Sequence, residues 1–142
     1  MARIWVNVEG AIYNNGKWLM IQRGDKEPHA AGTISMVGGT LETTQDEENA
    51  LEKTLIREIR EEIGIEIEDE MEYIESKTFT ADNNQKTIDI VFLCRYKSGE
   101  PKAMTDEVAD ILWLTKEEIL EHPKTPPWIK RSIELANGLV PN

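Results

Sequence analysis

The sequence predicts a single α/β domain, in which helices cover both faces of a mixed sheet to form an α/β/α sandwich. Three observations lead to this prediction. Strand-like runs occur in both halves of the chain, one long amphipathic helix interrupts them, and two shorter helices follow the last strand. The chain has 142 residues, of which 39% are hydrophobic, so residues 1–142 are expected to form one domain with one core.

The first third of the chain is predicted to form a hairpin, a loop and a short strand. Arg3 to Tyr13 and Lys17 to Arg23 have strand composition, and Asn14-Asn15-Gly16 between them is a strong turn signal. Gly24 to Gly32 has the composition of a loop. Thr33 to Val37 is predicted to be a short strand that leads into a pair of glycines.

The long helix is predicted to run from the mid-forties to Ile63. Its apolar residues recur every four positions and form one stripe, namely Leu51, Leu55, Ile59 and Ile63. Gly64 follows the stripe, where a left-handed helix end is expected. The start is open, because three residues are suitable N-caps, namely Thr43, Thr44 and Asp46.

The second half of the chain is predicted to add three strands. Glu72 to Thr80 and Lys86 to Tyr96 form a second hairpin around Asp82-Asn83-Asn84, whose residue types favour turns. Glu107 to Leu114 is a further strand.

Two short helices are predicted to end the chain. Thr115 and Glu118 have the spacing of a capping box for the first, which His122-Pro123 ends. The second begins near Pro126-Pro127, because proline suits a first helical turn, and runs to Asn137-Gly138.

Composition and charge exclude several classes of protein. The formal net charge of −11 leaves no broad basic surface, so binding to a nucleic-acid polymer is not expected. No segment is apolar and long enough to span a bilayer, and the N-terminus does not resemble a secretion signal. Cys94 is the single cysteine, so we expect a buried, inert thiol and a cytoplasmic location. Arg3 to Val8, as an edge strand, leaves pairing with a second copy in a homodimer open.

The run Arg57-Glu58-Ile59-Arg60-Glu61-Glu62-Ile63-Gly64-Ile65 places three carboxylates on one helical face. Glu61 and Glu62 lie about 60° and about 40° to either side of Glu58 around the helix axis. Close like charges repel each other unless a hard cation neutralises them, and oxygen ligands suit Mg²⁺ or Mn²⁺. The alternative is an ordinary solvated face, with Arg57 and Glu61 as a weak pair.

A glycine loop favours the metal site over that alternative. Val37-Gly38-Gly39-Thr40-Leu41-Glu42 precedes the helix, and two glycines allow the backbone to approach a ligand closely. This loop and the run from Arg57 to Ile65 together closely resemble the box of the Nudix hydrolase family. The expected strands and terminal helix also agree with the Nudix fold, so the resemblance covers nearly all of the chain.

The resemblance implies an enzyme that acts on a phosphoric anhydride bond. The implied substrate is a nucleoside diphosphate linked to a group X, and the implied cofactor is Mg²⁺ or Mn²⁺. The implied metal ligands are Glu58, Glu61, Glu62 and the backbone of Gly39. Glu58 or Glu61 would also serve as the base for water, and Arg57 would orient the glutamates.

The first half of the box departs from the family pattern. It has about four more residues than usual, which is close to one helical turn. Two explanations are open: the helix starts one turn earlier, or the loop through Thr43, Thr44, Gln45 and Asp46 is longer. Asn49 stands where the family has a glutamate, and three nearby residues could replace it, namely Glu47, Glu48 and Glu52. Val37 stands where proline is common.

Three further residues are expected to contact the substrate. Arg23 ends a strand near the glycine loop and could bind a phosphate. Trp128 begins the last helix and could stack on a base. Glu100 lies in a loop after a strand, where MutT-like relatives can carry another metal-binding glutamate, and Glu107 is its rival. For each of them an ordinary surface or packing role is the alternative.

A nucleoside triphosphate is the expected substrate, because the chain is one short MutT-like domain. The alternatives are ADP-ribose, a nucleotide sugar or a dinucleoside polyphosphate. A Nudix-like module that binds a nucleotide without hydrolysing it and an acidic scaffold protein are the alternatives from other classes.

Overall fold

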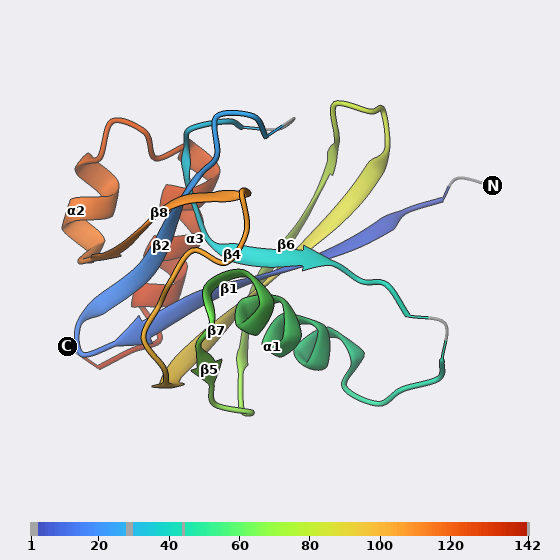
Figure 1. The fold of residues 1–142 in the computed structure, drawn as a ribbon, viewed down its shortest axis with the longest axis horizontal. Coiled ribbons are helices and arrows are strands. Elements are labelled where there is room, and N and C mark those ends of the chain that lie inside the picture. The colour runs from blue at the N-terminus through green and yellow to red at the C-terminus, as the bar shows by residue number, and fades with distance from the viewer. Residues whose placement is uncertain (1–2, 28–29, 44, 142) are drawn as a thin grey trace.

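The computed structural model describes residues 3–27, 30–43 and 45–141, and it confirms the predicted α/β architecture (Figure 1). Eight strands form one mixed sheet, and three helices pack on it. The strands are β1 (Trp5–Asn14), β2 (Lys17–Arg23), β3 (Ile34–Ser35), β4 (Val37–Thr40), β5 (Glu66–Ile67), β6 (Glu72–Thr80), β7 (Lys86–Ser98) and β8 (Val108–Leu114). The helices are α1 (Ala50–Ile63), α2 (Lys116–Glu121) and α3 (Pro127–Asn137).

Strand β1 lies at the centre of the sheet. It pairs in parallel with β7 along Trp5 to Tyr13, whereas every other pairing in the sheet is antiparallel. On its other side, β1 pairs first with β4 and then with β2, so the sheet divides there. The prediction of Arg3 to Val8 as an edge strand is wrong for Asn7 and Val8, which pair with β7 on one side and β4 on the other, whereas Trp5 and Val6 are in register with β7 alone.

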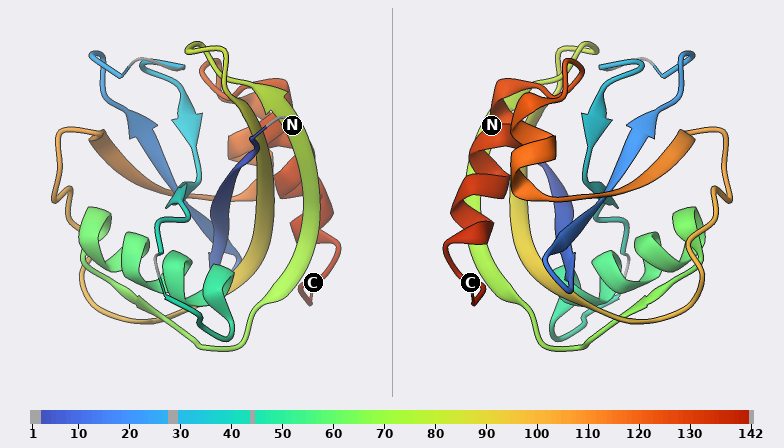
Figure 2. Two further views of the ribbon diagram at one scale, coloured as in Figure 1. Left: turned by 90° about the vertical axis from the view of Figure 1, so that its right-hand side faces the viewer. Right: turned by 90° about the vertical axis from the view of Figure 1, so that its left-hand side faces the viewer.

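Helices cover the two faces of the sheet as the prediction required. Figure 2 shows α1 and α3 on opposite sides of the layer formed by β1, β7 and β6. Strand β2 contributes to the core on both faces: Leu19 and Ile21 pack on the side of α1, and Trp18 and Met20 on the side of α3. Alternate residues of a strand point to opposite faces, so this division follows directly from the sequence.

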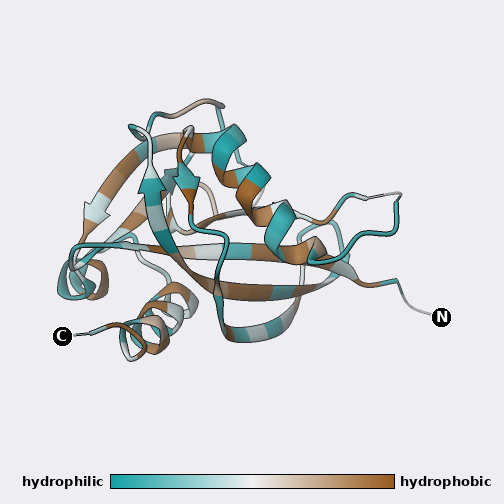
Figure 3. Ribbon diagram, turned by 90° about the horizontal axis from the view of Figure 1, so that it is seen from below, coloured by the Kyte–Doolittle hydropathy of each residue, from teal (hydrophilic) through white to brown (hydrophobic). Residues whose placement is uncertain are grey.

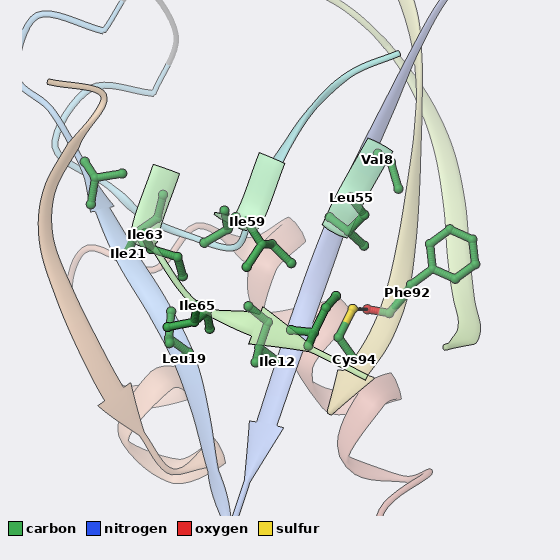
Figure 4. Packing of buried hydrophobic residues seen from close by; sticks show 13 residues of the cluster. Val8, Ile12, Leu19, Ile21, Leu55, Ile59, Ile63, Ile65, Phe92 and Cys94 are labelled. Carbon is green, nitrogen blue, oxygen red and sulfur yellow. Dashed lines mark hydrogen bonds between the residues drawn. The ribbon is translucent and has the colours of Figure 1, made fainter. Parts of the chain in front are cut away.

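Helix α1 is held to the sheet by the predicted apolar stripe. Leu55, Ile59 and Ile63 are fully buried, and Leu51 packs against the same cluster (Figure 4). Brown and teal segments alternate along α1 in Figure 3, which is the hydropathy pattern of an amphipathic helix. Gly64 ends the helix with φ 70°, as predicted.

Replacing Ile59 with alanine is expected to lower the free energy of unfolding by about 2–5 kcal/mol, because it leaves a cavity in this cluster. Leu135→Ala on α3 is the matched control, since Leu135 is 40% exposed and should cost far less. Chemical denaturation monitored by circular dichroism measures both. Equal losses in the two variants would contradict this packing.

The start of α1 differs from the prediction. The helix begins at Ala50, with Asn49 as N-cap at φ 55°, so neither Thr43 nor Asp46 caps it, and Thr44 lies outside the described residues. Asparagine tolerates the left-handed conformation, which a right-handed helix cannot continue through. The additional residues therefore lengthen the loop before the helix.

The other local predictions agree closely with the structure. Asn15 and Gly16 both have positive φ, as a tight hairpin turn requires. Thr115 and Glu118 form the capping box at the start of α2. The strand expected at 33–37 is divided into β3 and β4, and the short strand β5 was not predicted.

Cys94 is buried on β7, and burial raises the pKa of its thiol to about 12, which agrees with an inert side chain. None of the described helices is long and apolar enough to cross a membrane.

Candidate active site

A pocket of about 600 Å³ joins residues that are far apart in the sequence. Its wall contains most of the residues expected to act on a substrate, namely Arg23, Gly38, Gly39, Glu58, Glu62 and Trp128. They come from β2, β4, α1 and α3. A volume of this size is in the usual range for small-molecule sites.

The two glycines of β4 bring this strand into close contact with β1 and α1. A methyl group on Gly38 would lie 2.0 Å from the carbonyl oxygen of Val8. On Gly39 it would lie 2.5 Å from Cδ of Glu58. The Glu58 side chain therefore occupies the space that a side chain at 39 would take, so a carboxylate lies directly beside the backbone of β4.

Glu58 is half-buried in the pocket wall. Burial raises the pKa of its carboxyl, the charge of Arg57 counteracts that rise, and the charges of Glu61, Glu107 and Glu42 add to it. The guanidinium of Arg57 lies 3.6 Å from Oε1 of Glu58. Arg57 therefore contacts the carboxylate that it is predicted to orient.

Glu62, one turn further along α1, is only 9% exposed. Burial raises the pKa of Glu62 to about 9, with contributions from a hydrogen bond to Glu107 and from the charges of Glu107 and Glu58, while Arg23 opposes them. A hydrogen bond between two carboxyl groups requires a proton on one of them. The pair is therefore unstable as two bare carboxylates and would be stabilised by a proton or a cation.

The stability of the protein without divalent ions is expected to decrease between about pH 4.5 and 9. The folded state raises the pKa of Glu62 from 4.5 to about 9, so folding favours the protonated form. The benefit is complete below the unfolded pKa and is lost as the pH rises through this window. Thermal melting in a chelator should show this loss, and Glu62→Gln should reduce it. An identical pH dependence in both proteins would contradict the assignment.

The remaining predicted residues are not all in the pocket. Glu61 is exposed on α1 and lies outside the pocket wall formed by the described residues, although its charge reaches Glu58. Glu100 is exposed in the loop after β7 and is likewise outside this wall. Its rival Glu107, just before β8, does line the pocket and contacts Glu62.

The loop before α1 contains a candidate replacement for the glutamate that the family has at position 49. Asn49 lies at the start of α1, beside a different surface depression that Glu52 also lines. Glu47 is 3.7 Å from Lys53. Glu42 lines the active-site pocket, and its charge acts on Glu58. Glu42 is therefore a loop carboxylate at the pocket, where it could replace the glutamate that the family has at the position of Asn49.

The donor set fits a hard divalent cation. Carboxylates of Glu58, Glu62 and Glu107 and the half-buried backbone of Gly39 offer oxygen ligands of the kind that Mg²⁺ and Mn²⁺ prefer. Burial is the main cause of the raised pKa values of Glu58 and Glu62, and neighbouring carboxylates add a repulsion that a cation would relieve. Within the described ranges, no three His, Cys, Asp or Glu side chains already surround one ion position, so the side chains would have to move together to bind it.

Arg23 and Trp128 lie at other parts of the same pocket. The guanidinium of Arg23 is 3.1 Å from Oε2 of Glu27, and its charge lowers the pKa of Glu62. Trp128 is 44% exposed at the start of α3, so part of its ring is accessible to a ligand.

The pocket also contains charged residues that the motif does not include. Glu9, Lys77 and Asp89 line it from β1, β6 and β7. The sequence carried a signal for two of them, because Glu9 follows the apolar Val8 and Asp89 stands between Ile88 and Ile90. Which other residues they would meet depends on the pairing of β1 with β7, which no local pattern shows.

Comparisons with known proteins agree with this geometry. The NUDIX domain family matches residues 5–136. No curated protein matches the chain.

Solved structures share the fold. A MutT NUDIX hydrolase from Burkholderia pseudomallei superposes with a TM-score of 0.78 at 24% identity, covering 94% of this chain and 98% of that one. A MutT protein from Methanosarcina mazei Go1 has a TM-score of 0.77 at 22% identity, covering 96% and 95%. The NUDIX domain of Shewanella oneidensis NrtR, solved with ADP ribose, has a TM-score of 0.76 at 20% identity, covering 97% of this chain and 89% of that one. The family match extends over nearly the whole chain, and it includes the glycine pair and the glutamates of α1, so this protein belongs to the Nudix hydrolase family.

Proposed function

We propose that the protein hydrolyses a nucleoside triphosphate between two of its phosphates, with Mg²⁺ or Mn²⁺ as cofactor. The observation that carries the proposal is the meeting of Glu58 and Glu62 with the Gly38-Gly39 backbone in one pocket. This combination provides oxygen ligands beside a space large enough for a nucleotide.

Glu58, Glu62 and the backbone of Gly39 would hold the ion, with Glu61 joining them from the exposed side of α1. When bound, such an ion neutralises phosphate oxygens and lowers the pKa of a coordinated water. Glu107 takes the part first assigned to Glu100, since it contacts Glu62 in the pocket.

Glu58 is the proposed base. Its pKa is raised by burial, so its carboxylate binds a proton more readily than an exposed glutamate. The guanidinium of Arg57, at 3.6 Å, would favour one orientation of this carboxylate. Glu58 would accept a proton from water as the water attacks a phosphorus atom, and Glu61 is the second candidate for this step.

The substrate would lie with its phosphates at the glutamate end of the pocket. Arg23 would bind a phosphate oxygen, since it lines the pocket and acts electrostatically on Glu62. Trp128 would stack on the base from the start of α3.

ADP-ribose is the second candidate substrate, because the NUDIX domain of NrtR, which has a similar fold, was solved with ADP ribose. The choice of a triphosphate depends on the single short domain. The buried thiol of Cys94 is consistent with a reducing compartment, and we propose the cytoplasm.

A hydrolysis screen tests the proposal. Purified protein is incubated with nucleoside triphosphates, ADP-ribose, nucleotide sugars and dinucleoside polyphosphates, each with Mg²⁺, Mn²⁺ or chelator, and products are separated by ion-exchange chromatography. We expect ion-dependent release of pyrophosphate and a nucleoside monophosphate. Turnover of ADP-ribose alone would overturn the choice of substrate. Ion-dependent binding without turnover of any substrate would favour a binding module.

A further inference from the structure

A second group of charged side chains lies on the other face of the sheet from α1. Asn7 and Glu9 alternate on β1 with Val8, which packs in the core on the side of α1. Their side chains therefore point to the opposite face. Strand pairing places Asp89 beside Asn7 and Lys77 beside Asp89. All four residues line the active-site pocket.

Within this group, a buried donor atom and a buried acceptor atom form an ion pair but no hydrogen bond. Asp89 is 1% exposed, and its Oδ1 accepts a hydrogen bond of 3.2 Å from Nδ2 of Asn7. Its Oδ2 lies 3.6 Å from Nζ of Lys77, which is too long for a good hydrogen bond. Among the described residues, neither Oδ2 nor Nζ has a hydrogen-bond partner. Nζ is also 4.0 Å from Oε1 of Glu75.

Glu9, which is half-buried, adds a second carboxyl beside Asp89. Burial raises the pKa of Glu9 well above its usual value, and the charge of Asp89 and a hydrogen bond to it contribute further. The charge of Lys77 opposes this rise, and the group holds two carboxyls but only one ammonium. In the described part of the chain, no acceptor forms a hydrogen bond with the ammonium of Lys77. Leaving buried polar atoms without hydrogen bonds is unfavourable, so a ligand that forms hydrogen bonds with them would be bound favourably.

The surroundings suit a flat, neutral ring. Met36, Phe79 and Trp128 line the same pocket and offer apolar surface. A phosphate would meet the carboxyls of Glu9 and Asp89, which repel it. A nucleobase carries a hydrogen-bond acceptor and a donor side by side on its edge, which complements an ammonium beside a carboxylate.

We propose that Lys77 and Asp89 form the specificity-determining contact of this enzyme, with the ammonium donating to a base acceptor and the carboxylate accepting from the neighbouring base N–H. The proposal rests on the proposed function, because it assumes that the pocket binds a nucleotide. It places the base on the face of the sheet opposite α1 and the phosphates beside α1.

The test measures binding, so it does not depend on turnover. Calorimetry compares the affinities of triphosphates of the four bases with that of 1-deoxyribose 5-triphosphate, which lacks a base. In the four nucleotides, a methylene group replaces the scissile bridging oxygen. In the wild type, we expect the preferred base to improve affinity at least about 10-fold over the analogue without a base. Asp89→Asn, which exchanges an acceptor for a donor, should reduce this ratio below about 3-fold or change which base is preferred. Lys77→Met should also reduce the ratio.

Glu72→Gln is the matched control, because it removes one carboxylate from β6 at an exposed position that pairs with Arg95. It should leave the ratio unchanged. Thermal melting shows whether each variant is folded. If either Asp89→Asn or Lys77→Met fails to fold, the other variant still tests the proposal.

The proposal is overturned if both folded variants keep the wild-type ratio and base order, which would also be the result if these residues contacted only the ribose. It is also overturned if the wild type binds the analogue without a base as tightly as the nucleotides. Failure of the proposed function looks different, since none of the triphosphates, with or without a base, would then bind.

Discussion

Glu62→Gln should reduce ion-dependent hydrolysis by about 10²-fold or more in kcat while leaving the protein folded. Glutamine has nearly the same shape, but it cannot carry the negative charge that a cation requires. In the absence of ions the substitution should not destabilise the protein, because Glu62 lies buried against Glu107 and its charge is already disfavoured there. This opposite response of activity and stability is typical of a functional carboxylate.

Steady-state kinetics with Mg²⁺ and thermal melting in chelator measure the two effects. Glu52→Gln is the matched control on the same helix, because Glu52 lies beside a different surface depression. It should keep near wild-type kcat. Full activity in Glu62→Gln would show that the site is assigned to the wrong residues, and equal loss in Glu52→Gln would indicate a general effect of charge on α1. Glu61→Gln tests separately whether the exposed glutamate takes part.

Gly39→Ala is expected to lower kcat by at least about 10-fold with only modest loss of stability. Its methyl group would lie 2.5 Å from Cδ of Glu58, so the Glu58 side chain must move. This side chain ends in the pocket and can rotate away, which displaces the proposed base but leaves the core intact. A misplacement of about 1 Å can cost about 10²-fold in rate.

Gly38→Ala provides the contrast one residue earlier. There the methyl group would lie 2.0 Å from the carbonyl oxygen of Val8, which belongs to the backbone of the central strand and cannot rotate away. This variant should therefore lose several kcal/mol of stability, or fail to fold. Denaturation and kinetics on both variants measure the difference. If Gly39→Ala were fully active, or lost as much stability as Gly38→Ala, Glu58 would not be held as described.

Features that depend on neighbouring residues were predictable from the sequence. The tight turn at Asn15 and Gly16, the capping box of Thr115, and the buried stripe of α1 are all encoded within a few positions. The match of the glycine pair and the α1 glutamates to the family's box was sufficient to indicate the chemistry. Glu58 and Glu62 were placed in the pocket on that basis.

Features that depend on strand pairing were not predictable in this way. The segment from Arg3 to Val8 was predicted to be an edge strand, but β7 pairs with it from Trp5 onward and β4 pairs with its other side from Asn7 onward. Glu9 and Asp89 meet only because β1 and β7 pair in parallel. Glu107 reaches Glu62 through a loop whose course no periodic pattern shows. The start of α1 depended on the backbone conformation of one residue, Asn49.

The alternation of side chains along β1 has an evolutionary consequence. Val8 belongs to the core beneath α1, where the glutamates are held, whereas Asn7 and Glu9 face the other side of the sheet. Substitutions at odd-numbered positions can therefore change which ligand the pocket accepts while the neighbouring even-numbered positions continue to support the glutamates. One strand thus separates two traits under selection, and a lineage could acquire a new substrate without rebuilding its hydrolytic centre.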